Sequence, residues 1–181
     1  MAPLTEGSVL VRPFEIGDVP AVTAACQDRE ISRWTATIPW PYREEHASWW
    51  ILTHGDLWDR GEGAEFAITR APTDDLVGAV GLRPIDWENR KAVAGYWVAA
   101  WARNEGIATK ALTLVTDWAF QHVGLQVVEL QTMIGNRASE RVAEKAGFDL
   151  VGTISDAEHP LADDQRFNVK RWALTHPDPD G

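Results

Sequence analysis

The residues best suited to chemistry lie where an apolar strand gives way to a helix rich in small residues. Arg103, Gly106 and Ala108 stand there in the order Arg-x-x-Gly-x-Ala. The first turn of a helix presents backbone N–H groups without intrahelical partners, and the helix dipole adds partial positive charge. Small residues let an anion approach these groups closely, so the motif predicts a pyrophosphate-binding turn. Taken alone, it also fits an ordinary capping glycine.

A second polar segment begins the next predicted helix. Asn136 is suited to cap that helix, Ser139 lies in its first turn, and Gly147 is suited to end it. Both polar side chains have a structural alternative, because Asn136 can act as a cap only and Ser139 can be a tolerated helical residue. Arg141 and Lys145 are basic, but Glu140 and Glu144 beside them favour a solvated face of mixed charge.

Hydrophobic periodicity places both segments in an α+β arrangement. We expect strands at 8–14, 64–69, 76–82, 92–98, 127–134, 150–154 and 166–174, and helices at 18–28, 43–60, 106–122 and 136–146. The strand, helix and strand over 92–134 form a right-handed crossover with a parallel pair. A polar loop at 155–164 joins the last two strands, and the tail at 176–181 is expected to fray. The sequence predicts one domain over residues 1–181, with a mixed sheet of about seven strands and about four helices.

Composition excludes several classes of function. The net charge of −10 argues against a nucleic-acid binder, since such binding depends on Lys and Arg neutralising phosphates. Negative charge suits a cationic amine substrate, although it also serves solubility. Cys26 is the single cysteine, so we expect no multi-cysteine metal site and a buried core thiol. The chain has no signal-peptide pattern and no apolar run long enough to span a membrane, so we expect a cytoplasmic protein without membrane contact.

Two motifs together resemble one family. Arg103-x-x-Gly106-x-Ala108 matches the Arg/Gln-x-x-Gly-x-Gly/Ala signature of the GNAT acetyltransferases, in the expected strand–loop–helix setting. Asn136-x-x-Ser139, followed by the helix end Glu-Lys-Ala-Gly-Phe at 144–148, is similar to the hallmark of the RimJ/RimL-like branch. The order of elements agrees with that family over residues 8–175. A nucleotide-binding α/β protein fits less well, because the glycine motif follows several antiparallel strands.

The resemblance implies an N-acetyltransferase that uses acetyl-CoA and no metal, on a sheet splayed at its middle pair of strands. Ser139 would lie near the coenzyme sulfur and protonate or hydrogen-bond the leaving thiolate. The implied coenzyme-binding residues are Trp97, Val98, Arg103, Asn104, Glu105, Gly106, Ile107, Ala108, Thr109, Asn136 and Ser139. Dimers are common in this fold, so a homodimer is expected by analogy only. A non-catalytic acyl-CoA-binding or partner-binding module on the same fold is the alternative.

The general base is not identified by the resemblance. Many relatives place a glutamate on the central strand just before the Gly-Tyr pair, but residues 92–94 of this chain read Ala-Val-Ala. Glu88, in the loop before that strand, is therefore the expected base. Asp86, Glu158, His159 and a relaying water are the other candidates.

The acceptor should be a small-molecule amine or a peptide N-terminus. The chain has ten tryptophans, and several of them gather in the segment 34–50. Aromatic faces suit both cations and apolar groups, so Trp34, Trp40 and Tyr42 are expected to line the acceptor side. A packed helical cap without ligand contacts is the alternative.

Overall fold

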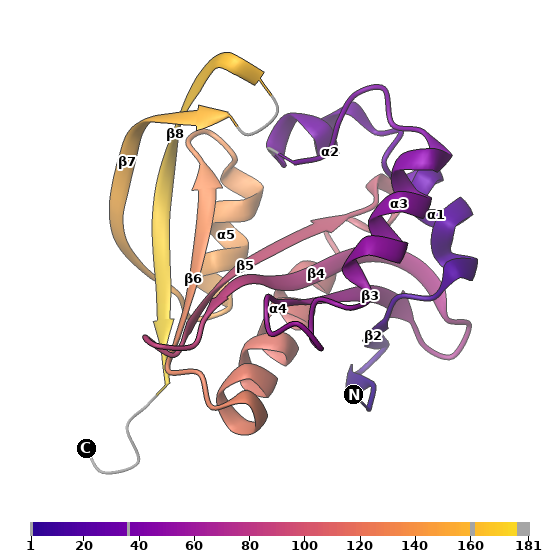
Figure 1. Cartoon of the computed structure of the whole chain (residues 1–181), viewed down its shortest axis with the longest axis horizontal. Coiled ribbons are helices and arrows are strands. Elements are labelled where there is room, and N and C mark those ends of the chain that lie inside the picture. The colour runs from indigo at the N-terminus through magenta and orange to yellow at the C-terminus, as the bar shows by residue number, and fades with distance from the viewer. Residues whose placement is uncertain (1, 36, 160–161, 177–181) are drawn as a thin grey trace.

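The computed structural model describes residues 2–35, 37–159 and 162–176 (Figure 1). The strands are β1 (Leu4–Glu6), β2 (Val9–Pro13), β3 (Ala64–Arg70), β4 (Asp75–Asp86), β5 (Lys91–Val98), β6 (Val127–Met133), β7 (Asp149–His159) and β8 (Ala162–Thr175). They form one sheet in the order β1-β2-β3-β4-β5-β6-β8-β7. The pair β5–β6 is parallel, and the other described pairs are antiparallel.

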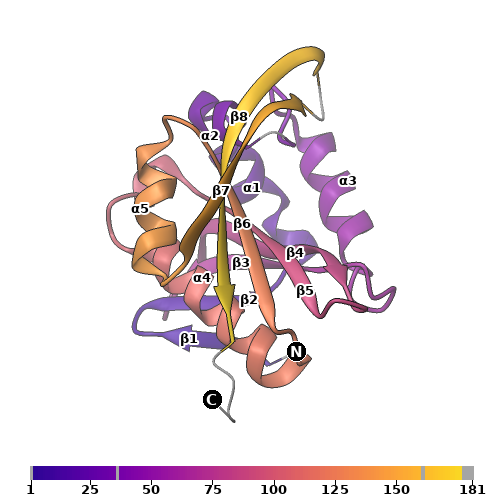
Figure 2. The ribbon, with the colours of Figure 1, turned by 90° about the vertical axis from the view of Figure 1, so that its left-hand side faces the viewer.

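Helices cover both faces of this sheet. They are α1 (Val19–Ala25), α2 (Arg29–Trp34), α3 (Glu44–His54), α4 (Ile107–Trp118) and α5 (Arg137–Lys145). Figure 2 shows the sheet between α5 and α3. Two buried clusters correspond to the two faces: one joins the strands to α4, and the other joins them to α1, α2 and α3.

Strand alternation in β5 assigns its residues to the two faces. Ala92, Ala94 and Tyr96 pack into the cluster with α4, whereas Trp97 packs into the cluster with α1–α3. Successive side chains of a strand point to opposite faces, so Gly95 shares the α1–α3 face with Trp97. The central strand therefore presents different residues to the two sides of the sheet.

The middle pair of strands separates partway along its length. Residues Lys91–Ala94 of β5 pair with Val127–Leu130 of β6, and the register ends there. Beyond this point β5 continues to Val98 beside β4, and β6 continues to Met133 beside β8. Figure 1 shows the two strands diverging. The predicted splay is confirmed, and it opens a gap in the middle of the sheet.

Several predicted boundaries were wrong. The helix expected at 18–28 ends at Ala25, and a separate helix, α2, begins at Arg29, where the Asp28 side chain caps it by accepting from the Glu30 N–H. The helix expected at 43–60 ends at His54 and passes into turns. The polar loop expected at 155–164 is largely strand, since backbone pairing between β7 and β8 continues to His159 and Ala162. The short strand β1 was not expected; it pairs with β2 across a turn at Gly7.

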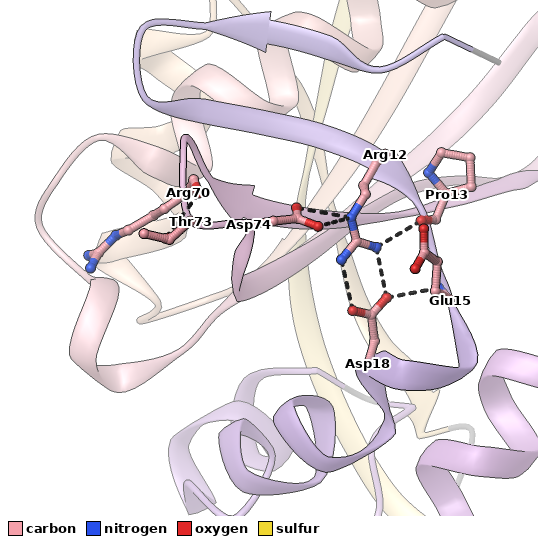
Figure 3. A network of polar contacts seen from close by, with 7 residues as sticks. All are labelled: Arg12, Pro13, Glu15, Asp18, Arg70, Thr73 and Asp74. Carbon is pink, nitrogen blue, oxygen red and sulfur yellow. Dashed lines mark hydrogen bonds and ion pairs between the residues drawn. The ribbon is translucent and has the colours of Figure 1, made fainter.

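A buried polar network fixes α1 against the sheet (Figure 3). The Arg12 guanidinium donates to both oxygens of Asp18 at 2.8 and 2.9 Å, and its Nε donates to Asp74 at 3.0 Å. Asp18 also accepts from the Glu15 N–H at 2.8 Å. These bonds raise the pKa of Arg12 and lower that of Asp74. The network joins β2, the β3–β4 turn and the start of α1.

Among the described residues, no helix combines the length and the hydropathy that crossing a bilayer requires.

Candidate active site

The first turn of α4 has the geometry of an anion site. Gly106 precedes the helix with φ +76°, in the left-handed region that favours glycine, and no side chain caps the helix at this end. Asn104 in the same turn also has positive φ, at 65°. The first amides of α4 are therefore left open to a ligand, as the sequence predicted for an anion-binding turn.

A cavity of about 1080 Å³ connects this turn to the gap between β5 and β6. Its lining includes Trp97, Val98, Arg103, Asn104, Gly106, Ile107, Ala108, Thr109, Asn136 and Ser139. The structure therefore brings ten of the eleven residues expected at the coenzyme together around one space. Glu105 is the exception. Its carboxylate points to Arg70 and accepts a hydrogen bond from the Arg70 guanidinium at 2.7 Å.

The start of α5 faces β5 across the cavity. Asn136 Oδ1 accepts from the Ser139 N–H at 3.1 Å, so this residue does cap the helix while it lines the cavity. Ser139 Oγ lies 2.7 Å from Tyr96 Oη in a shared hydrogen bond. Burial raises the pKa of Tyr96 to about 12, so its phenol keeps its proton at neutral pH. The pair can donate a proton or a hydrogen bond to a group at this point.

Basic side chains surround the anion-binding end. Arg141 and Lys145 line the cavity, whereas Glu140 is turned away and pairs with Lys170 at 2.9 Å. The sequence had favoured a solvated face of mixed charge for this helix. Arg141, Glu144 and Lys145 are indeed exposed, whereas Glu140 is buried against β8, and the two cations border the cavity as well.

The Arg103 side chain has a structural partner. It donates to Asp28 at 2.5 Å and to the Val98 carbonyl at 3.2 Å. These bonds join the loop before α4 to α2 and to the end of β5. The position of Arg103 thus orders the turn that presents the open amides.

The opposite end of the cavity is aromatic. Trp34 and Tyr42 line it, together with Trp49, Trp50 and His46. Trp40 is 46% exposed and is absent from the described lining, so the structure does not place it at the cavity. Cys26 borders the cavity but is fully buried, which confirms the expectation of a core cysteine, and burial raises the pKa of its thiol to about 12.

The expected base, Glu88, lies away from this space. It is exposed in the turn between β4 and β5 and, like Asp86, is absent from the described lining of the cavity. This turn precedes the paired end of β5, whereas the gap opens beyond Ala94. The structure thus separates Glu88 from the other expected site residues. The side chains of Glu158 and His159 lie outside the described residues.

A carboxylate that sequence reasoning missed does line the cavity. Glu65 lies on β3, its side chain is 16% exposed, and burial raises its pKa to about 7. In the sequence it resembles any polar residue at the start of a half-buried strand. The available signal was indirect. The residue opposite Glu65 on β4 is Gly81, and the residue opposite Gly81 on β5 is Gly95, so two glycines lie in the same row as the glutamate.

Comparison with known proteins agrees with this geometry. Residues 8–149 match the family model described as the acetyltransferase (GNAT) domain. The uncharacterised N-acetyltransferase YoaA of Bacillus subtilis is 26% identical over 155 residues, which cover 85% of this chain and 87% of that protein. The ribosomal-protein-serine acetyltransferase of Escherichia coli is 29% identical over 102 residues, or 56% of each chain. The structure of Mycobacterium smegmatis RimJ in complex with CoA-disulfide is similar with a TM-score of 0.82 at 25% identity, covering 96% of this chain and 86% of that one.

Proposed function

The chain belongs to the GNAT acetyltransferase family, and we propose that it transfers the acetyl group of acetyl-CoA to a primary amine by direct attack. The acceptor is a protein N-terminal α-amine or a small-molecule amine. The observation that carries this proposal is the open first turn of α4 at one end of a cavity that reaches the gap between β5 and β6.

The residues around that turn fit a coenzyme with a diphosphate. The amides of Gly106 to Thr109 would bind the pyrophosphate, and Arg141 and Lys145 would add charge at the same end. The unpaired edges of β5 and β6 beyond Ala94 would hydrogen-bond the pantetheine amides as an added strand does. The coenzyme would supply an activated acetyl thioester at the gap.

Tyr96 and Ser139 are placed to assist the leaving group. In the proposed reaction the Ser139 hydroxyl donates to the departing sulfur, and Tyr96 restores the serine proton through their 2.7 Å hydrogen bond. A thiol has a pKa near 8.5, so its thiolate leaves readily and needs only modest help from an acid. Cys26 is buried with a raised pKa, which supports direct transfer rather than an acyl-cysteine intermediate.

The aromatic end of the cavity suits an amine with an apolar neighbour. Trp34, Tyr42 and Trp50 would contact the body of the acceptor, and the protein's net charge of −10 favours a cation. An α-amine costs about 1 kcal/mol to deprotonate at pH 7, whereas a lysine costs about 4.6 kcal/mol. The name of the E. coli relative supports a ribosomal-protein N-terminus as the first acceptor to test.

A thiol-release assay with acetyl-CoA tests the proposal. The panel should contain N-terminal peptides of ribosomal proteins, lysine-containing peptides with blocked N-termini, polyamines and free amino acids. We expect release of one thiol per amide formed, fastest with an α-amine, and no acetylated protein after mixing with acetyl-CoA alone. Thermal protection by CoA without thiol release on any acceptor would instead identify a non-catalytic binder. The cytoplasmic location and the homodimer stay predictions.

A further inference from the structure

Glu65 lies in a row of residues that crosses three strands. Its partner in the β3–β4 register is Gly81, and the partner of Gly81 in the β4–β5 register is Gly95. Residues directly opposite each other on neighbouring strands share a face of the sheet. The three residues therefore lie on the α1–α3 face, in the wall of the cavity, and the last of them stands where β5 leaves β6.

The two glycines leave room for the glutamate to reach toward the gap. A Cβ on Gly81 would collide with the Glu65 carboxylate, so the side chain lies across this glycine. A Cβ on Gly95 would meet nothing within 4 Å, which leaves open space beyond. Strands are about 4.7–4.9 Å apart, so a carboxylate over Gly81 is about one strand spacing from the β5 backbone. An amine, or an amine and one water, fits in that interval.

The histidines of the cavity are already engaged. Arg83 donates to His54 Nε2 at 2.8 Å, and arginine is only a donor, so Nε2 must accept. His54 Nδ1 then carries the hydrogen and donates to the Trp50 carbonyl at 2.9 Å. His46 Nδ1 accepts from the Arg43 N–H at 3.1 Å, which places any hydrogen of the neutral ring on its Nε2. Neither ring presents a free acceptor nitrogen to a substrate.

The surroundings of Glu65 suit a proton acceptor. Arg83 Nε approaches Glu65 Oε1 at 3.8 Å, a contact too long for a tight ion pair. Burial raises the pKa of Glu65 to about 7, and Arg83 opposes that rise. The other carboxylate of the lining, Glu30, already accepts from Arg33 and from Trp34 Nε1. In the described lining, Glu65 is therefore the carboxylate that accepts no side-chain hydrogen bond, and it faces the gap.

We propose that Glu65 is the general base of the acetyl transfer, a role that rests on the proposed function. Its carboxylate takes one proton from the ammonium form of the acceptor, directly or through one water, and releases that proton to solvent. The neutral nitrogen then forms the C–N bond while the C–S bond breaks with its electron pair on sulfur. The nitrogen loses its second proton to the Glu65 carboxylate, which has passed the first one to solvent. The sulfur takes the Ser139 proton, which Tyr96 and then solvent replace, so the protons balance.

The groups proposed to act in the reaction thus lie on opposite faces of the sheet. Glu65, Gly81 and Gly95 lie on the face of α1–α3, where the acceptor enters between aromatic side chains. Tyr96 and Ser139 lie on the face of α4 and α5, where the leaving sulfur is received. The gap between β5 and β6 is the passage that lets groups on opposite faces act on one carbonyl carbon.

The test compares Glu65→Gln with Glu62→Gln, a nearby exposed glutamate paired with Arg60. With the best acceptor, E65Q should lower kcat/KM by about 10²- to 10⁴-fold, whereas E62Q should match wild type. The wild-type rate should rise with pH through about 7, whereas that of E65Q should rise only as the acceptor amine itself loses its proton, near pH 8 for an α-amine. The Kd for CoA should stay unchanged in both variants, because Glu65 lies outside the coenzyme-binding turn.

A second readout does not depend on activity. A carboxylate whose pKa is raised in the folded state favours folding while it is protonated, so this stability is lost as pH rises through the folded value. The Tm of ligand-free wild type should therefore fall between about pH 5 and about pH 8 relative to that of E65Q. Parallel Tm profiles of the two proteins would overturn the proposal.

A second substitution tests the placement of the carboxylate. Gly81→Ala should displace Glu65 and lower kcat by about 10-fold, and combining it with E65Q should add little further loss. If wild type turns over and E65Q stays within twofold of it, the base assignment is wrong while the acetyltransferase proposal stands. Loss of activity in Glu88→Gln with E65Q unimpaired would also overturn it. Absence of turnover by wild type on every acceptor would refute the proposed function itself.

Discussion

The hydroxyls of Tyr96 and Ser139 lie 2.7 Å apart, which joins the central strand to the first turn of α5. Their chain separation of 43 residues means that only the folded sheet brings them together. The same serine N–H donates to the Asn136 cap, so the position of the hydroxyl is fixed from both sides.

Removing either hydroxyl should slow acetyl transfer modestly. We expect Ser139→Ala and Tyr96→Phe each to lower kcat by about 10- to 100-fold, since the thiolate needs little help to leave. The double variant should lose little more than S139A alone, because the two groups act as one unit. Steady-state kinetics with saturating acetyl-CoA measures this. Additive losses would show that the two hydroxyls act separately.

The left-handed turn before α4 should control coenzyme affinity. Gly106→Ala leaves no clash, since a Cβ there meets nothing within 4 Å, but it imposes a left-handed conformation at a cost of about 1–2 kcal/mol. We expect the Kd for CoA to rise by about 10-fold, measured by calorimetry. Gly17→Ala is the matched control, because its Cβ also meets nothing and its φ is not in the left-handed region. Equal affinities for G106A and wild type would contradict the anion-site assignment.

Arg83 should set the pH at which the enzyme becomes active. Its charge lowers the pKa of Glu65, so Arg83→Met should raise that pKa above its present value of about 7. The rising limb of the pH–rate profile should then move to higher pH. The same variant should release His54 Nε2 from its donor. A limb that stays in place, or moves to lower pH, would show that Arg83 does not act on the group that titrates.

The network at Arg12 should dominate the stability of the α1 side of the fold (Figure 3). Arg12→Ala leaves Asp18 buried without its cation, and breaking such a pair costs about 3–5 kcal/mol. Arg60→Ala, which removes an exposed pair with Glu62, should leave the free energy of unfolding nearly unchanged. Urea denaturation of both variants measures the difference.

Low pH should weaken the same network. Arg12 lowers the pKa of Asp74, so the stability from this contact is present above the ordinary carboxyl pKa of 3.8 and is lost as pH falls through the lowered folded value. The Arg12→Ala variant should therefore show a flatter loss of Tm in acid than wild type. If the Tm of the variant fell more steeply in acid than that of wild type, other groups would be responsible for the acid dependence.

Local sequence patterns were sufficient to predict the features that a single helix or strand determines by itself. The Gly106 turn, the Asn136 cap and the strand–helix–strand order were all predicted, and the gap between β5 and β6 followed from the family resemblance. The patterns failed where tertiary contacts override polarity or periodicity. Asp28 lies in the helix expected at 18–28 but caps a new helix instead, and polar residues at 155–159 extend a strand because β8 pairs with them.

The sequence by itself predicted the open turn before α4, because such a turn consists of backbone amides at one helix start and needs no distant partner. The proposed base emerged only from the tertiary structure. Glu88 is near the central strand in sequence but lies in an exposed turn, whereas Glu65 is distant in sequence and reaches the cavity across Gly81. Cross-strand register, which is set by the packing of the whole sheet, puts that glutamate in one row with Gly81 and Gly95, and residue spacing along the chain does not encode it.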